Sequence, residues 1–298
     1  MRKYWPLYLM LLPGCVYLFI NNYIPMAGII IAFKKVNFSQ GIFASPFCGL
    51  SNFEFLFKTQ DAWIITRNTI LYNVAFIIVN LVVAIFFAIL ICEVQSKFAK
   101  KIYQSAILLP FLMSMVILSY IVYALFSSEN GMVNNSILPI FGKDPIAWYN
   151  EAKYWPAILI ITNCWKGVGY GCLIYLSTII GIDKSFYEAS QLDGATRWQQ
   201  IRYITLPGLK TTIITMVLLS VGKIFYSDFG LFYQVPMNSG TILNTTNVID
   251  TYVYRALLQL GNVGMASAAG VYQSLVGFVI VLLSNWAVKK ADADSALF

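Results

Sequence analysis

The sequence contains no histidine and very little charge. Asp, Glu, Lys and Arg make up 11% of its 298 residues, whereas a soluble domain carries about 25%. Without histidine, the commonest general base and metal ligand is missing, together with every Ser/His/Asp and Cys/His catalytic arrangement. The composition therefore excludes a compact soluble enzyme, and hydrolytic chemistry within the chain is not expected.

Cysteine is present without the pattern of a disulfide framework or a metal site. The five cysteines are odd in number, and they include no Cys-x-x-Cys pair. Four of them stand inside apolar segments, namely Cys15, Cys92, Cys164 and Cys172. We expect these four to be small core residues.

Long hydrophobic runs dominate the chain instead. Hydrophobic residues make up 59% of it, and the mean hydropathy is +0.70. A spanning helix needs about 20 apolar residues, because its backbone polar groups must be satisfied within the segment. Six segments meet this need, namely Tyr4–Phe33, Asn68–Cys92, Ile102–Phe126, Trp155–Ile180, Leu209–Val235 and Met265–Val288. We therefore expect an all-α membrane protein with six transmembrane helices.

We interpret the net charge of +7 as a result of the positive-inside rule, by which Lys and Arg gather on the cytoplasmic side of a membrane protein. The basic residues stand singly or in small groups at the ends of apolar segments, without the aromatic interleaving of a nucleic-acid-binding patch. With both termini in the cytoplasm, the inner segments carry more Lys and Arg than the longer outer ones. Lys34 and Lys35, directly after the first span, argue against this orientation. We expect both termini to be cytoplasmic in a multi-pass protein of the plasma membrane, of bacterial type.

The N-terminus allows a second interpretation. Arg2 and Lys3, followed by an apolar stretch that reaches Cys15, are typical of a lipoprotein signal with a lipid-accepting cysteine. The apolar run nevertheless continues to Phe33, which is long enough for a retained span. We therefore expect a retained first helix.

The longest inner loop, residues 181–208, holds the most specific pattern. Ser185 followed by Glu188 predicts a capping box that opens a short helix, and Gly194 predicts its end. A second short helix is expected over Ala195–Tyr203, and Pro207 marks the entry to the fifth span. The sequence thus predicts a rigid helical bend that can dock in a groove of another protein.

This loop resembles the EAA loop of permease subunits in binding-protein-dependent ABC importers. The matching positions are Glu188, Ala189, Ser190, Asp193, Gly194, Ala195, Arg197, Leu206 and Pro207. Ser190 stands where the family usually has its second Ala. The extended pattern around Asp193 and Arg197 resembles the carbohydrate branch, which imports oligosaccharides. The implied fold is the transmembrane domain of a type I ABC importer.

The resemblance implies a division of labour between subunits. The EAA helix, called the coupling helix, would sit in a cleft of a cytoplasmic ATPase, with Glu188 paired to a basic residue there. No G-x-x-x-x-G-K-[ST] run occurs in the sequence, so ATP and Mg would be bound by the partner ATPase. Two ATPase copies, a second homologous permease in a heterodimer, an extracellular solute-binding protein and the sugar would be the partners. An amphipathic helix resting on lipid is the alternative for this loop.

The domain boundaries follow from the same resemblance. An added N-terminal transmembrane helix is expected at 1–34 and an extracellular loop at 35–67. A five-helix permease core is expected at 68–290, with the coupling loop at 181–208 and a cytoplasmic tail at 291–298.

A path for sugars needs aromatic surfaces together with amides and hydroxyls. The candidate residues of the path are Trp165, Lys166, Tyr170, Tyr226, Phe229, Tyr233, Tyr272 and Gln273. Lys166, deep in its span, either lines this path or pairs with a carboxylate or carbonyls at a subunit interface formed by Gly167 and Gly171. Aromatic belts at the membrane interface explain some of these residues equally well.

Lys223 and Asp228 are the second pair of charges inside a span. We expect them to neutralise each other through a partly broken helix. The outer segment 247–255 resembles a stretch of the oligosaccharide permeases, which implies that it faces the binding protein, with Asp250 and Arg255 making separate contacts.

The sequence therefore predicts the permease subunit of a carbohydrate importer that works by alternating access. One alternative is the same machinery with another cargo, such as amino acids or peptides. A secondary carrier would need paired intramembrane carboxylates, and only Asp228 lies within a span. A membrane-embedded enzyme has few catalytic side chains available.

Overall fold

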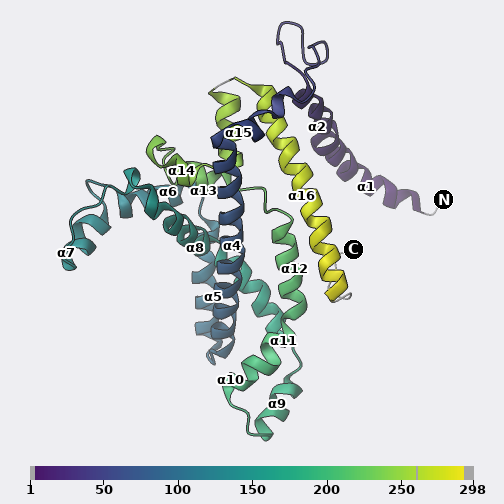
Figure 1. Cartoon of the computed structure of the whole chain (residues 1–298). Helices are drawn as coiled ribbons and strands as arrows, with labels where there is room; N and C mark the ends of the chain where they lie inside the picture. The colour runs from purple at the N-terminus through teal and green to yellow at the C-terminus, as the bar shows by residue number, and fades with distance from the viewer. Residues whose placement is uncertain (1–3, 260, 292–298) are drawn as a thin grey trace. The chain divides into compact units, whose positions relative to one another are not determined.

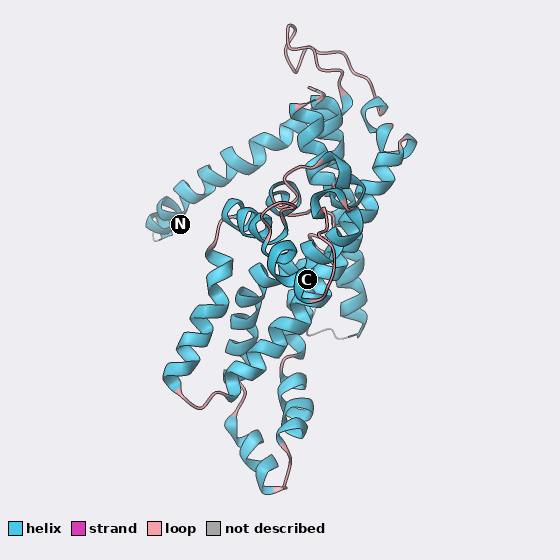
Figure 2. Ribbon diagram, turned by 90° about the vertical axis from the view of Figure 1, so that its left-hand side faces the viewer, coloured by secondary structure: helices cyan, strands magenta, loops and turns pink. Residues whose placement is uncertain are grey.

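The computed structural model describes residues 4–259 and 261–291. They form helices joined by loops (Figure 2), and the described residues hold no strand beyond one isolated bridge between Lys34 and Phe47. The helices are α1 (Trp5–Leu18), α2 (Ile24–Met26), α3 (Phe55–Lys58), α4 (Gln60–Glu93), α5 (Lys97–Leu112), α6 (Met115–Phe126), α7 (Leu138–Ile140), α8 (Trp155–Ile180), α9 (Lys184–Leu192), α10 (Arg197–Gln200), α11 (Leu206–Gly208), α12 (Lys210–Val221), α13 (Phe229–Gln234), α14 (Leu243–Thr246), α15 (Ile249–Leu258) and α16 (Val263–Ala291) (Figure 1). The expected tail at 291–298 lies outside the described residues except for Ala291, which is the last residue of α16.

Four helical segments are long and apolar enough to cross a membrane, namely Leu7–Phe33, Gln60–Glu93, Ala152–Ile180 and Val263–Lys290. Two more candidates are bent pairs. Lys97–Leu112 and Met115–Phe126 meet at 96°, and Arg197–Gly208 and Lys210–Val221 meet at 55°. By length and composition, the described residues therefore contain four candidate spans, or six if each bent pair is counted as one span.

The expected third span is divided into two helices. α5 ends at Leu112, Met113 is extended, and α6 begins after Ser114, whose hydroxyl accepts a hydrogen bond from the N–H of Ile117 at 3.3 Å. Pro110 lies in the last turn of α5, where it cannot donate a backbone hydrogen bond. A serine that caps a new helix this close to a proline explains the break.

The fifth span is also interrupted, and the second begins earlier than expected. α12 ends at Val221 and the next helix begins at Phe229, where the carboxylate of Asp228 accepts from the N–H of Leu231 at 3.1 Å. A carboxylate in this position starts a helix instead of continuing one. α4 begins at Gln60, so part of the segment expected as an outer loop is helical.

The chain divides into two units, which are described separately. One holds residues 4–63 and 252–275. Within it, the side-chain amide of Asn52 donates to the carbonyls of Ala32 and Lys34, at 3.0 Å each. Gly264 packs so closely on Asn52 that an added Cβ would stand 2.7 Å from its amide nitrogen. These contacts fix the loop that follows the first helix.

The other unit holds residues 64–251 and 276–291, and it contains two apolar cores. One core gathers around Trp155 and Leu159 of α8, with Leu231 and Phe232 of α13. The second core joins α4, α8 and the start of α12, and it includes Cys172. α8 runs through both cores, so burial of its apolar side chains holds this unit together.

Glycine lets α5 approach α8 very closely. A Cβ added to Gly169 would stand 2.1 Å from the carbonyl oxygen of Ile107. Gly167 and Gly171, which one of the two interpretations of Lys166 placed at a subunit interface, face α4 of the same chain, toward Asn80 and Ala84. The cysteines are free thiols, and Cys15 is exposed, contrary to the expected core position.

Candidate functional site

The first candidate site is the elbow, residues 183–208, which lies at the opposite end of its unit from α14 (Figure 1). The expected capping box at Ser185 and Glu188 was wrong. Asp183 caps α9 instead, and its carboxylate accepts from the N–H of Ser185 at 2.9 Å. This hydrogen bond lowers the pKa of Asp183, because it stabilises the ionised form. A capping box does form at the start of α10, between Thr196 and Gln199.

Gly194 makes the bend of the elbow. Its φ is +78°, a left-handed conformation that residues with a side chain rarely adopt. The turn is closed by hydrogen bonds from the N–H of Gly194 to the carbonyl of Gln191, at 3.1 Å, and from Ala195 to Ser190, at 2.9 Å. α9 therefore ends sharply and the chain turns back toward α10.

Buried polar contacts hold α9 against the returning chain. The amide of Gln200 is buried, and it donates to the hydroxyl of Ser190 at 2.9 Å and to the carbonyl of Tyr187 at 3.3 Å. The hydroxyls of Tyr187 and Thr205 lie 2.9 Å apart. Ser190, at the position where the EAA pattern usually has Ala, thus supplies an acceptor that Ala lacks.

The elbow presents apolar side chains to its surroundings. Leu192 is 90% exposed, Trp198 67% and Phe186 61%. Glu188 is also exposed, and its carboxylate makes no hydrogen bond or ion pair within the described residues. This side of the elbow therefore combines exposed apolar side chains with an unpaired carboxylate, a combination that is typical of interaction surfaces.

The other side of the elbow faces the C-terminal end of α4. A cavity of about 590 Å³ lies there, lined by Glu188, Arg197, Glu93 and Lys100 among others. Arg197 approaches the carboxylate of Glu93 to 4.0 Å. The remaining predicted loop residues lie nearby: Ala189 and Asp193 are exposed, Ala195 is half-buried, and Leu206 and Pro207 lie in α11 ahead of α12.

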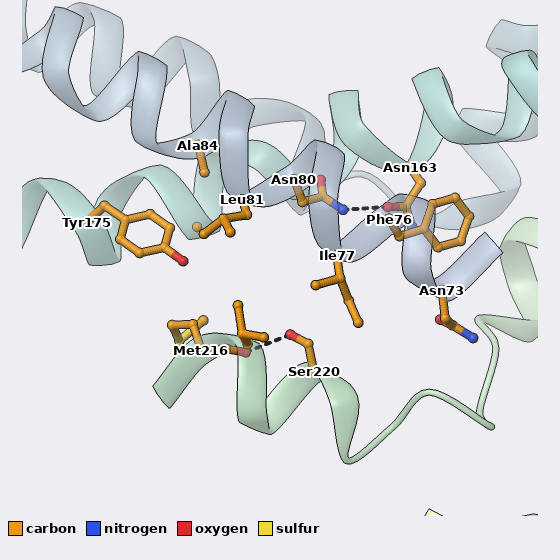
Figure 3. Close-up of a pocket in the computed structure, with 12 residues that line it drawn as sticks. Asn73, Phe76, Ile77, Asn80, Leu81, Ala84, Asn163, Tyr175, Met216 and Ser220 are labelled. Atoms are coloured by element: carbon orange, nitrogen blue, oxygen red, sulfur yellow. Dashed lines mark hydrogen bonds between the residues drawn. The ribbon is translucent and has the colours of Figure 1, made fainter. Parts of the chain in front are cut away.

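The second candidate site is a cavity of about 250 Å³ between α4, α8 and α12 (Figure 3). Its polar lining consists of Asn73 and Asn80 from α4, Asn163 and Tyr175 from α8, and Ser220 from α12. The amide of Asn80 donates to the side-chain oxygen of Asn163 at 2.8 Å. Amides and hydroxyls among apolar side chains suit a polyol, and the volume is near the lower end of small-molecule sites.

None of the eight predicted path residues is among those lining this cavity. The sequence held a signal that was missed. Asn73 and Asn80 are two helical turns apart in an apolar span, so they share one face. Amides are rarely placed in a membrane segment without a partner or a polar cavity.

Lys166 and Tyr170 both contact the end of α5. The ammonium of Lys166 donates to the carbonyls of Phe111, at 3.2 Å, and Met113. The ring of Tyr170 stacks on that of Phe111, with centroids 5.2 Å apart. Trp165 is 41% exposed. The charge of Lys166 is thus satisfied within the chain.

The other predicted path residues divide between the two units. Phe229 and Tyr233 stack on each other with ring centroids 4.9 Å apart, and Tyr226 is 42% exposed. Tyr272 and Gln273 belong to the unit that holds residues 252–275.

The expected neutralisation of Lys223 by Asp228 was wrong. No ion pair joins them in the described part of the chain, where Asp228 instead caps α13. The geometry of capping explains this, because the carboxylate is turned toward the N–H of Leu231.

Interrupted spans, a polar intramembrane cavity and an exposed elbow together define the membrane subunit of a transport system. The chain belongs to the family of binding-protein-dependent transport system inner membrane components, whose model matches residues 62–292. It is 34% identical to the polygalacturonan/rhamnogalacturonan transport system permease protein YteP of Bacillus subtilis, over 97% of this chain and 88% of that protein.

Solved structures agree with this assignment. A chain of a bacterial ABC transporter involved in the import of the acidic polysaccharide alginate matches with a TM-score of 0.89 and 33% identity. The match covers 98% of this chain and 97% of that one. A chain of a bacterial alginate ABC transporter, in complex with an alginate pentasaccharide-bound periplasmic protein, matches with a TM-score of 0.87 and 32% identity, over 97% and 96%.

Proposed function

We propose that this chain is the permease subunit of an ATP-driven importer that carries an oligosaccharide across the cytoplasmic membrane by alternating access. The observation that carries the proposal is the elbow, with Leu192, Trp198 and Phe186 exposed beside an unpaired Glu188 among the described residues. Such a surface fits a groove of a second protein. No ATP-binding P-loop motif occurs in the sequence, so the energy must come through this surface.

The sugar cargo is supported by two independent features. The permease and the importers that match along nearly the whole chain are described as acting on polysaccharides. The cavity between α4, α8 and α12 offers amides, a hydroxyl and the phenol of Tyr175, which are groups that hydrogen-bond sugar hydroxyls.

The proposed assembly contains this chain and a second homologous permease, two ATPase subunits and an extracellular solute-binding protein. ATP and Mg are bound by the ATPases. Both termini lie in the cytoplasm, on the side of the elbow.

In the proposed mechanism, closure of the ATPase dimer moves the elbow, and the elbow moves α12 directly, because only Leu209 separates α11 from α12. Gln200 and Tyr187 keep the elbow rigid, so displacement is transmitted instead of being absorbed. α8 and α12 both line the polar cavity, and their relative movement opens it to one side of the membrane or the other.

The test uses the complete importer in proteoliposomes, with labelled oligogalacturonides as cargo. Glu188→Ala is expected to reduce uptake at least about tenfold while ATP hydrolysis continues, because a desolvated charge contact at an interface is lost. Glu129→Ala, which removes an exposed carboxylate far along the chain, is the matched control. Uptake at the wild-type rate with Glu188→Ala would contradict the coupling role. Uptake that collapses with ionophores would instead indicate an ion-coupled carrier.

A further inference from the structure

Lys223 lies just beyond Val221, where the helical part of the fifth candidate span ends. The helix before it, α12, begins at Lys210, so Lys223 stands about 20 Å further along at 1.5 Å per residue. The hydrocarbon core is about 30 Å thick. A lysine at such a depth costs at least ~2.5 kcal/mol unless it pairs or faces a polar cavity.

The described residues give Lys223 no partner. Its side chain is exposed and makes no hydrogen bond or ion pair in the described part of the chain. The two nearby carboxylates are engaged elsewhere, since Asp228 accepts from the N–H of Leu231 and Asp250 accepts from the N–H of Ser227 at 2.7 Å. Lys223 therefore differs from Lys166, whose ammonium is bound by two carbonyls.

Lys223 also lies next to the polar cavity. Ser220 lines that cavity, and the N–H of Lys223 donates to the carbonyl of Ser220 at 3.0 Å, so Lys223 follows it by one turn. The amide of Asn73, another lining residue, donates to the carbonyl of Ile224 at 2.9 Å. The backbone that carries Lys223 is thus hydrogen-bonded to two residues that line the cavity, although Lys223 itself is not among the lining residues.

The cavity beside Lys223 has an uncharged, polar lining. The lining residues include amides, a phenol and a hydroxyl, and none of those described is a carboxylate or a cation. An ammonium beside such a lining offers a cationic contact together with hydrogen bonds to hydroxyls. A neutral sugar uses only the second of these contacts, whereas a carboxylate uses both.

We propose that Lys223 binds a carboxylate of the cargo, and that the cargo is an acidic oligosaccharide built from uronic acids. The proposal rests on the proposed function as a sugar importer. Within it, the amides of Asn73, Asn80 and Asn163 recognise hydroxyls, whereas Lys223 selects for negative charge.

The experiment compares charged and neutral forms of the same sugars in the complete reconstituted importer. Tetragalacturonate and tetramannuronate are each supplied as the free acid and as the full methyl ester. Lys223→Met, Lys223→Arg and the control Lys143→Met, which removes an exposed loop lysine, are measured against the wild type. Taking the variant-to-wild-type ratio for each probe cancels the preference of the binding protein, and size-exclusion chromatography reports assembly of each complex.

Lys223→Met is expected to reduce import of the acids at least about tenfold, from loss of a charged contact in a poorly solvated site. With Lys223→Met, import of each ester should stay near the wild-type rate for that ester. Lys223→Arg should restore import of the acids. Lys143→Met should change the import of neither acids nor esters.

The inference is overturned if the import rate of Lys223→Met relative to the wild type is the same for acids and esters, whether this ratio is near one or far below one. An equally low ratio would place the partner of Lys223 on the second permease. In both cases wild-type import of the sugars leaves the proposed function intact. If the wild-type importer moves neither acid nor ester with ATP, the assignment of uronic acids as the cargo is overturned, and the effect of Glu188→Ala on coupling still tests the proposed function separately.

Discussion

Lys166 of α8 closes the open end of α5, because its ammonium donates to the carbonyls of Phe111, at 3.2 Å, and Met113. The last carbonyls of a helix have no partner within the helix. A positive charge also suits this negative end of the helix dipole. One lysine thus satisfies its own charge and stabilises the 96° break between α5 and α6.

Replacement of Lys166 by Met should therefore destabilise the break. The two carbonyls lose their donor, at an expected cost of about 1–3 kcal/mol. Thermal unfolding of the purified complex in detergent measures the effect. Lys166→Arg retains the donors and should lose less. Equal stability of Lys166→Met and the wild type would show that the carbonyls find other partners.

Gly169→Ala should separate α5 from α8. The new methyl group would stand 2.1 Å from the carbonyl oxygen of Ile107, and the backbone there cannot turn away as a side chain could. Overpacking of this kind costs about 1–3 kcal/mol. The unfolding midpoint should fall.

Gly270→Ala is the matched control, because no atom lies within 4 Å of its added Cβ. Alanine favours a helix over glycine by about 1 kcal/mol, so this variant should be neutral or slightly more stable. Equal effects at the two glycines would contradict the close approach of α5 and α8.

Gly194→Val should impair transport more than it impairs stability. A β-branched residue at φ +78° is strained, by roughly 1–2 kcal/mol, and the elbow would change its angle. Space is not the cause, since no atom lies within 4 Å of an added Cβ. Uptake per ATP hydrolysed should fall, with little change in the unfolding midpoint.

Gly194→Asn is the control, because asparagine tolerates the left-handed region better than other residues with side chains. It should retain most of the coupling. If Val and Asn behave alike, the backbone angle at this position does not control coupling.

The start of α9 should loosen in acid. The hydrogen bond from the N–H of Ser185 lowers the pKa of Asp183 in the folded protein, so the unfolded carboxyl binds a proton more readily. The cap is therefore fully present above the ordinary pKa of about 4, and it is lost as the pH falls through the lower folded value.

Hydrogen exchange of the α9 amides at neutral and acidic pH measures this loss. Asp183→Asn keeps an acceptor that does not titrate, so the protection of its α9 amides should not depend on the titration of residue 183. In Asp183→Ala, the amides at the start of α9 should be unprotected at both pH values. A wild-type protein with the same protection at each pH would show that the cap does not hold α9.

The sequence predicted the helical membrane class well, because an apolar run of about 20 residues has few other uses. It also indicated the break in the fifth span, around Lys223 and Asp228, but it did not predict the break between α5 and α6. Pro110 and Ser114 are compatible with a bent continuous helix, and only the hydrogen bonds of Lys166 and Ser114 show that the chain stops and restarts. Hydrophobicity reports the length of a span and not its continuity.

For the candidate sites, local rules succeeded where one residue decides. Gly194 ends α9 as expected, since its left-handed backbone is a local property. The cap was misplaced because Asp183 and Ser185 both suit an N-cap, and the sequence alone does not rank them. The polar cavity was missed because it needs Asn80 and Asn163 from two helices that only the tertiary fold brings together.

The exposed tip of the elbow carries apolar side chains that nothing in the described part of this chain covers. Leu192 and Trp198 contact water whenever nothing covers them, and apolar surfaces of this kind adhere to one another. A cell that makes this polypeptide in excess over the proposed ATPase would therefore accumulate molecules with an uncovered apolar surface. Balanced synthesis of the subunits is thus a solubility requirement as well as a stoichiometric one.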